Sequence, residues 1–180
     1  MLDTSKRVVI VGLGLLGGRY ALGLTRAGFS VDGIDRSPEA VEFALKEGYI
    51  QRGAAENFAP LLAEAGYVVL GLYPTALLDW LKQYGGLLPA GCLVTDTCGV
   101  KTGVVDAAQA LMPEGVEFIG SHPMAGKEVS GVTNAHLVDF SPANFIITPT
   151  EKNTEAGLTF AWSLAETLGF QHITTLTPAE

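Results

Sequence analysis

The chain has 180 residues, of which 48% are hydrophobic and 17% charged. This balance excludes a disordered chain and supplies one apolar core. The 11 Lys and Arg against 19 Asp and Glu give a net charge of −8, which argues against nucleic acid as a partner. Cys92 and Cys98 are too few for a disulfide framework or a four-ligand zinc site. Without a leader pattern or a run of about 18 apolar residues, we expect a cytoplasmic protein with no membrane partner.

Predicted strands and helices alternate along the chain. Short apolar runs predict strands at Arg7–Val11, Ser30–Asp35, Tyr67–Leu72, Cys92–Asp96, Val116–Gly120, Asn144–Thr148 and Phe170–Thr174. Helical spacing predicts helices at Leu15–Ala27, Glu39–Glu47, Pro74–Tyr84, Val100–Leu111 and Thr154–Leu168. This alternation predicts an α/β fold, doubly wound, with a mostly parallel sheet and helices on both faces. The long irregular segment 121–142 is the kind of insertion that usually carries function.

A glycine motif, G-x-G-x-x-G, lies where the first predicted strand meets the first helix. Gly12 permits the tight turn, Gly14 lets a pyrophosphate approach the backbone, and Gly17 lets helix and strand pack closely. The helix begins at Leu15 and Leu16, and its N-terminal amides attract phosphate. The motif in this context predicts a Rossmann-like dinucleotide-binding domain.

The cofactor prediction rests on the residues that end the second strand. Asp35 lies 18 positions after Gly17, where an acidic side chain accepts hydrogen bonds from the adenosine ribose. Its charge repels a 2′-phosphate and favours NAD over NADP. Arg36 keeps NADP open as an alternative, because a guanidinium can bind that phosphate or stack on adenine. The sequence has no P-loop, no Tyr-x-x-x-Lys and no metal-binding histidine pattern, and we predict no metal site.

A histidine follows the strand predicted at Val116–Gly120, in the segment Gly-Ser-His-Pro-Met-Ala-Gly-Lys-Glu-Val-Ser-Gly over residues 120–131. His122 therefore stands at the carboxyl edge of the sheet, where open α/β sheets bind ligands. Pro123 restricts it to an extended backbone, and a histidine accepts a proton near neutral pH. On these residues alone, a catalytic base and a histidine that caps a turn are equally open.

This histidine segment, the glycine motif and the segment Asp-Thr-Cys-Gly-Val-Lys over residues 96–101 together resemble the prephenate/arogenate dehydrogenase family of tyrosine biosynthesis. The resemblance covers essentially the whole chain, and the histidine segment is its most specific part. It implies NAD-dependent oxidative decarboxylation of prephenate to 4-hydroxyphenylpyruvate. His122 would take the proton of the substrate's 4-hydroxyl as hydride leaves the same carbon. Arogenate is the alternative substrate.

The resemblance also implies roles for residues around His122. Ser121 would contact the nicotinamide or orient the imidazole, and Lys127 and Glu128 would lie at the substrate. Cys98 is expected to be a packed thiol, because the chemistry needs no covalent intermediate. The residues placed at the cofactor by the same resemblance are Tyr73, Pro74, Thr97 and Gly99, the last standing where the family often has serine.

Family members carry a second, helical domain that dimerises, closes the pocket and supplies an arginine for the substrate carboxylate. Residues 1–180 match the dinucleotide-binding domain alone, and the helical domain is expected to be absent. We therefore expect weak or no turnover from the isolated chain, since half of the anion-binding pocket is missing. Two alternatives are a non-catalytic dinucleotide-binding module and a hydroxyacid dehydrogenase of the 6-phosphogluconate type, which shares the glycine motif but usually carries its lysine base in the following domain.

Overall fold

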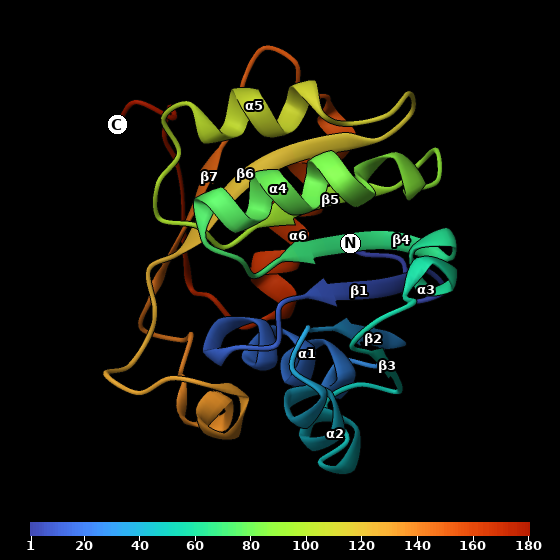
Figure 1. Cartoon of the computed structure of the whole chain (residues 1–180). Coiled ribbons are helices and arrows are strands. Elements are labelled where there is room, and N and C mark those ends of the chain that lie inside the picture. The colour runs from blue at the N-terminus through green and yellow to red at the C-terminus, as the bar shows by residue number, and fades with distance from the viewer.

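A computed structural model describes all 180 residues and shows one eight-stranded sheet with the strand order β3-β2-β1-β4-β5-β6-β7-β8 (Figure 1). Neighbouring strands run parallel except β6 and β7, which are antiparallel. The doubly wound, mostly parallel fold predicted from the sequence is confirmed. The strands are β1 (Arg7–Val11), β2 (Val31–Ile34), β3 (Arg52–Ala54), β4 (Ala65–Leu70), β5 (Leu93–Asp96), β6 (Glu117–Pro123), β7 (Asn144–Thr148) and β8 (His172–Thr175).

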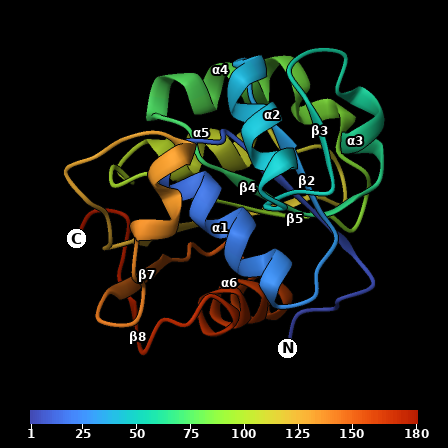
Figure 2. The ribbon, with the colours of Figure 1, turned by 90° about the horizontal axis from the view of Figure 1, so that it is seen from below.

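Helices cover both faces of the sheet (Figure 2). One face carries α1 (Leu15–Arg26), α2 (Pro38–Lys46), α6 (Glu155–Thr167) and the 3-10 helix η2 (Val132–Leu137). The opposite face carries α3 (Ala59–Ala63), α4 (Pro74–Tyr84) and α5 (Val104–Ala110), and the 3-10 helix η1 (Gly85–Leu87) follows α4. Figure 2 shows α4 and α6 on opposite sides of the strands.

The central strands are apolar at every position because they are buried on both sides. In β1, Val8 and Ile10 pack under α1 and α6, whereas Val9 and Val11 pack under α4. All four side chains are at most 2% exposed. Successive strand residues point to opposite faces, so an uninterrupted apolar run feeds both cores. Each such burial contributes about 2 kcal/mol to folding.

Four elements were not predicted: β3, α3, η1 and η2. Arg52–Ala54 has no apolar run, since this edge strand is three residues long and only partly buried. We had expected Ser121 and His122 to belong to the irregular segment 121–142. In the structure the strand β6 extends to Pro123, so both residues lie in a strand. Pairing with β7 causes the extension, because β7 follows some twenty residues later and no local pattern reveals it.

The strand β6 changes its neighbour halfway along. Glu117–Ile119 pair in parallel with β5, and the register of the second half runs from Gly120 opposite Thr148 to Pro123 opposite Phe145. The end of β6 therefore reaches beyond the end of β5. His122 consequently lies beside Gly99, in the loop that follows β5.

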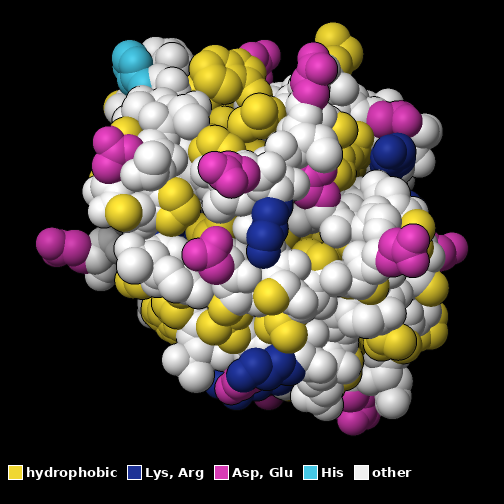
Figure 3. Space-filling view, turned by 90° about the horizontal axis from the view of Figure 1, so that it is seen from above, with side chains coloured by type: hydrophobic (Ala, Val, Ile, Leu, Met, Phe, Trp, Pro, Cys, Tyr) yellow, Lys and Arg dark blue, Asp and Glu magenta, His cyan; other side chains and the backbone are white.

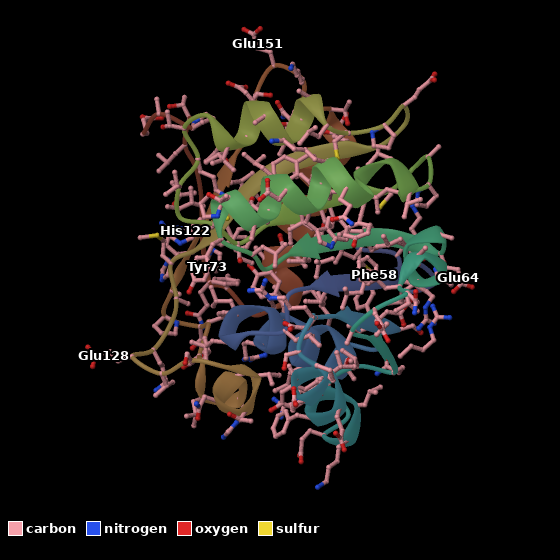
Figure 4. All side chains as sticks on the ribbon, in the orientation of Figure 1. Phe58, Glu64, Tyr73, His122, Glu128 and Glu151 are labelled. Atoms are coloured by element: carbon pink, nitrogen blue, oxygen red, sulfur yellow. The ribbon has the colours of Figure 1, made fainter.

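The opposite end of the sheet is held by ion pairs around one buried carboxylate. Asp32 of β2 is 0% exposed and accepts hydrogen bonds from Arg7 and Arg52, and Arg52 also pairs with Glu64 at 2.7 Å. Burial raises the pKa of Asp32, but the hydrogen bonds from the two arginines more than reverse this and hold it below the ordinary 3.8. Figure 4 shows Glu64 at the end of the molecule opposite His122.

The chain carries a net charge of −8, and charged side chains of both signs are dispersed over the face shown in Figure 3. In Figure 3, which looks down on the face at the top of Figure 1, Lys and Arg side chains stand singly among Asp, Glu and hydrophobic side chains. No helix has the length and apolar content that crossing a membrane requires.

Candidate active site

A hollow of about 570 Å³ opens at the carboxyl ends of the central strands. Four segments line it: the loop after β1, the turn after β4, the loop after β5, and the end of β6 with the loop beyond it. Parallel strands end at one edge, which is why segments so distant in sequence meet here. The sequence-predicted residues that the hollow brings together are Gly14, Leu15, Leu16, Gly17, Tyr73, Pro74, Thr97, Gly99, His122 and Lys127.

The three glycines of the loop after β1 differ in what surrounds them. Gly12 has φ +92°, and a Cβ there would collide with the carbonyl oxygen of Gly71. A Cβ at Gly17 would overlap the carbonyl of Gly12, because α1 packs directly against the turn. At Gly14 a Cβ would meet nothing within 4 Å. Gly12 and Gly17 therefore shape the loop, and Gly14 leaves its backbone open to the hollow.

Asp35 has a structural role that the sequence did not reveal. Its carboxylate accepts hydrogen bonds from the amide of Leu13 at 2.7 Å and from the amide of Ser37 at 2.8 Å. One side chain thus connects the glycine loop to the start of α2. Asp35 is half-buried and Arg36 is exposed, and neither lines the hollow. Their contacts with a ribose or a 2′-phosphate remain predictions.

His122 is half-buried and lines two hollows. The second has a volume of about 400 Å³ and is also lined by Lys101, Thr148 and Glu180. A Cβ at Gly99 would lie 3.3 Å from Nε2 of His122, so glycine at this position leaves the imidazole edge uncovered. Burial and the nearby charge of Lys101 lower the pKa of His122 below 6.5, against an opposing effect of Asp96. The imidazole is therefore neutral near pH 7 and able to accept a proton.

Ser121 and Glu128, two further predicted site residues, also lie outside both hollows. Ser121 is fully buried, and its hydroxyl bonds to the carbonyl of Asp96 at 2.9 Å and to the hydroxyl of Thr95 at 2.7 Å. Ser121 and His122 are adjacent strand residues, so their side chains project to opposite faces. Glu128 lies at the tip of the exposed loop after β6, farther out than His122 and Tyr73 (Figure 4). The roles of Ser121 and Glu128 remain predictions.

Cys98 is held as a neutral thiol in the wall of the first hollow. Its Sγ donates a hydrogen bond to the carbonyl of Leu72 at 2.9 Å, and burial raises its pKa to about 12. The same packing joins the loop after β5 to the turn after β4. No three His, Cys, Asp or Glu side chains gather closely enough to hold a metal ion.

Sequence reasoning assigned no role to Asp96. This residue is 0% exposed at the end of β5, where it pairs with Lys101 and accepts hydrogen bonds from the amides of Cys98 and Ser121. The available signal was an acidic residue that ends an apolar strand, five positions before a lysine. That signal does not show which backbone groups the carboxylate meets.

The fold and the hollow define the class as a Rossmann-like nucleotide-binding domain, with a histidine in the wall of the hollow at the carboxyl edge of its sheet. A sequence model of the family described as "Prephenate dehydrogenase, nucleotide-binding domain" matches residues 20–174. The chain belongs to the prephenate dehydrogenase family. The resemblance noted in the sequence is thereby confirmed.

Individual relatives agree with this assignment. Prephenate dehydrogenase of Bacillus subtilis is 36% identical over 149 residues, which are 81% of this chain and 40% of that protein. The crystal structure of prephenate dehydrogenase from Aquifex aeolicus, in complex with hydroxyphenyl propionate and NAD+, has a TM-score of 0.87 at 28% identity and covers 97% of this chain and 60% of that chain. Synechocystis arogenate dehydrogenase has a TM-score of 0.85 at 31% identity, with coverage of 96% and 60%. The chain spans about two fifths of the curated relatives' length.

Proposed function

We propose that this chain is the NAD-binding and base-carrying part of a prephenate dehydrogenase, which converts prephenate to 4-hydroxyphenylpyruvate and carbon dioxide. The observation that carries the proposal is the position of His122, which lines the same hollow as the glycine loop. A dinucleotide lying along that loop would bring its nicotinamide end toward the histidine. The Aquifex aeolicus relative, whose structure contains NAD+, supports the cofactor.

The residues of the hollow, together with Asp35 and Arg36 after β2, would divide the binding of NAD between them. The backbone at Gly14 and the first amides of α1, at Leu15 and Leu16, would hold the pyrophosphate. Tyr73, Pro74, Thr97 and Gly99 would enclose the nicotinamide half. Asp35 would accept hydrogen bonds from the adenosine ribose and favour NAD over NADP, with Arg36 as the group that would favour NADP.

His122 would act as the general base. Its neutral imidazole would accept the proton of the substrate's 4-hydroxyl while hydride leaves the same ring carbon. Bound NAD+ supplies the hydride acceptor. Loss of the ring carboxylate as carbon dioxide then gives the aromatic product, so that one positioned base and one positioned nicotinamide suffice. Lys127 in the wall and Glu128 at the loop tip would contact the substrate, and Ser121 would fix the strand that carries the base.

The remaining parts of the activity go beyond these 180 residues. The chain spans about two fifths of its curated relatives, and we propose that a helical domain supplies the arginine for the substrate carboxylate and the dimer contact. Arogenate is the alternative substrate, which the similarity to the Synechocystis enzyme supports. We place the reaction in the cytoplasm, where the two free cysteines stay reduced.

The test compares turnover by these 180 residues alone with turnover by a fusion that adds a helical domain. We expect little NADH from the chain with prephenate and NAD+, and substantial NADH once it is fused to the remaining C-terminal part of the Bacillus subtilis relative. In that fusion His122→Gln should lower kcat by about 10²- to 10⁴-fold. The matched control is His172→Gln, the same change at an exposed histidine outside the hollows, which should leave kcat unchanged. Full activity of the His122→Gln fusion would contradict the assignment of the base.

A further inference from the structure

One buried carboxylate joins the strand of His122 to the loop that faces it. Oδ1 of Asp96 accepts a hydrogen bond at 3.0 Å from the amide of Ser121, the residue immediately before His122. Oδ2 accepts one at 3.1 Å from the amide of Cys98 and also pairs with the ammonium of Lys101. Asp96 therefore fixes both the backbone from which His122 projects and the loop on the other side of the imidazole.

Lys101 contributes a buried positive charge at the same place. Its side chain is 7% exposed, its carboxylate partner is Asp96, and it lines the second hollow together with His122. A buried ion pair is weak evidence for stability, because the cost of removing two charges from water often exceeds their attraction. Asp96 of this pair is hydrogen-bonded to Ser121, the residue next to the proposed base. This position gives the ion pair a reason other than stability.

We propose that Asp96 and Lys101 are positioning residues for His122: Asp96 holds its strand in place, and Lys101 maintains a positive charge beside its imidazole. The inference deepens the proposed function, because it rests on His122 acting as the base. The pair would prepare the histidine before any ligand arrives.

The charges around His122 agree with this assignment. Asp96 ends β5 and Lys101 lies in the loop beyond it, Cys98 and Lys127 line the first hollow with His122, and Glu180 lines the second. Of these groups, Lys101 lowers the pKa of His122 and Asp96 raises it. A cation this close disfavours protonation of the imidazole and keeps its lone pair available.

The test is an NMR titration of the histidine imidazoles in the 180-residue chain, which needs neither cofactor nor turnover. The chain has three histidines, and loss of one signal in His122→Gln assigns His122. We expect Lys101→Met to raise the pKa of His122 by about one unit and Asp96→Asn to lower it by a similar amount. Lys101→Arg, which keeps the charge, should restore the original value to within a few tenths of a unit.

Opposite shifts are the decisive feature. If Asp96 and Lys101 only stabilised the fold, both variants would expose His122 to water. The pKa of His122 would then move toward 6.5 in both. The control is Asp32→Asn, the same change at another wholly buried, cation-paired carboxylate at the far end of the sheet, which should leave the pKa of His122 unmoved. If Lys101→Met does not fold, the direction in Asp96→Asn decides alone. An unchanged or raised pKa in Asp96→Asn would overturn the proposal, whether or not the chain binds NAD.

Discussion

The chemical character of His122 depends on neighbours that are distant in sequence. Lys101 lies 21 residues before it, and its ring lines a hollow that is shared with the segments after β1, β4 and β5. Sequence reasoning identified the histidine from the Pro that follows and the apolar strand that precedes it. Those residues alone left the base and the turn-capping histidine equally open, because burial and charge at a side chain are set by tertiary packing, and it was the family resemblance that favoured the base.

A pH dependence of stability follows from the lowered pKa of His122. Its pKa is below 6.5 in the folded chain, and near 6.5 in the unfolded chain. As the pH falls through 6.5, the unfolded chain takes up a proton that the folded chain resists, so this residue reduces stability on the acid side. His122→Gln should therefore have a shallower fall in the free energy of unfolding between about pH 7 and pH 5. Urea unfolding at several pH values measures both slopes, and equal slopes would contradict the lowered pKa.

At the scale of elements, sequence patterns predicted the bounds of those strands and helices that are determined by neighbouring residues. The predicted bounds of β1, α4 and β7 agree with the structure because apolar runs, helical spacing and flanking glycines are properties of neighbouring residues. The extension of β6 and the presence of β3 depend on pairing partners elsewhere in the chain. The alternation of side chains along β6, in the half that pairs with β7, buries Ser121 and lets His122 line the hollows.

The glycine loop offers a direct separation of folding from binding. Gly17→Ala should destabilise the chain by about 2–4 kcal/mol, because its Cβ would overlap the carbonyl of Gly12 and force α1 away from the turn. Gly14→Ala should change stability by less than about 1 kcal/mol, since its Cβ meets nothing within 4 Å and its φ is −92°. The added methyl group would nevertheless occupy the path of the pyrophosphate.

Thermal unfolding and NAD+ binding, measured on both variants, check these expectations. Gly17→Ala should have a lower Tm than the unchanged chain. Gly14→Ala should keep its Tm but bind NAD+ at least tenfold more weakly, a difference of about 1.4 kcal/mol in binding free energy. Unimpaired NAD+ binding by Gly14→Ala would place the cofactor away from this loop.

At the scale of the whole molecule, the two ends of the sheet differ in structure. The end near Asp32 is closed by paired charges, whereas the carboxyl end opens into the hollow. Strand geometry predicted that His122 stands at the carboxyl edge of the sheet. The turn after β4 and the loop after β5 were placed at the cofactor only by the family resemblance. Sequence reasoning did not predict Asp96 and Lys101 as a pair or the contact of Asp35 with the glycine loop, because such contacts depend on side-chain directions that only the assembled fold determines.

The central claim is that the hollow binds NAD, and a calorimetric titration of the chain with NAD+ and, in parallel, NADP+ tests it most directly. The account predicts saturable binding of NAD+, weaker binding of NADP+ because Asp35 repels a 2′-phosphate, and loss of the NAD+ signal in Gly14→Ala. A folded chain that binds neither dinucleotide, or that prefers NADP+, would contradict it.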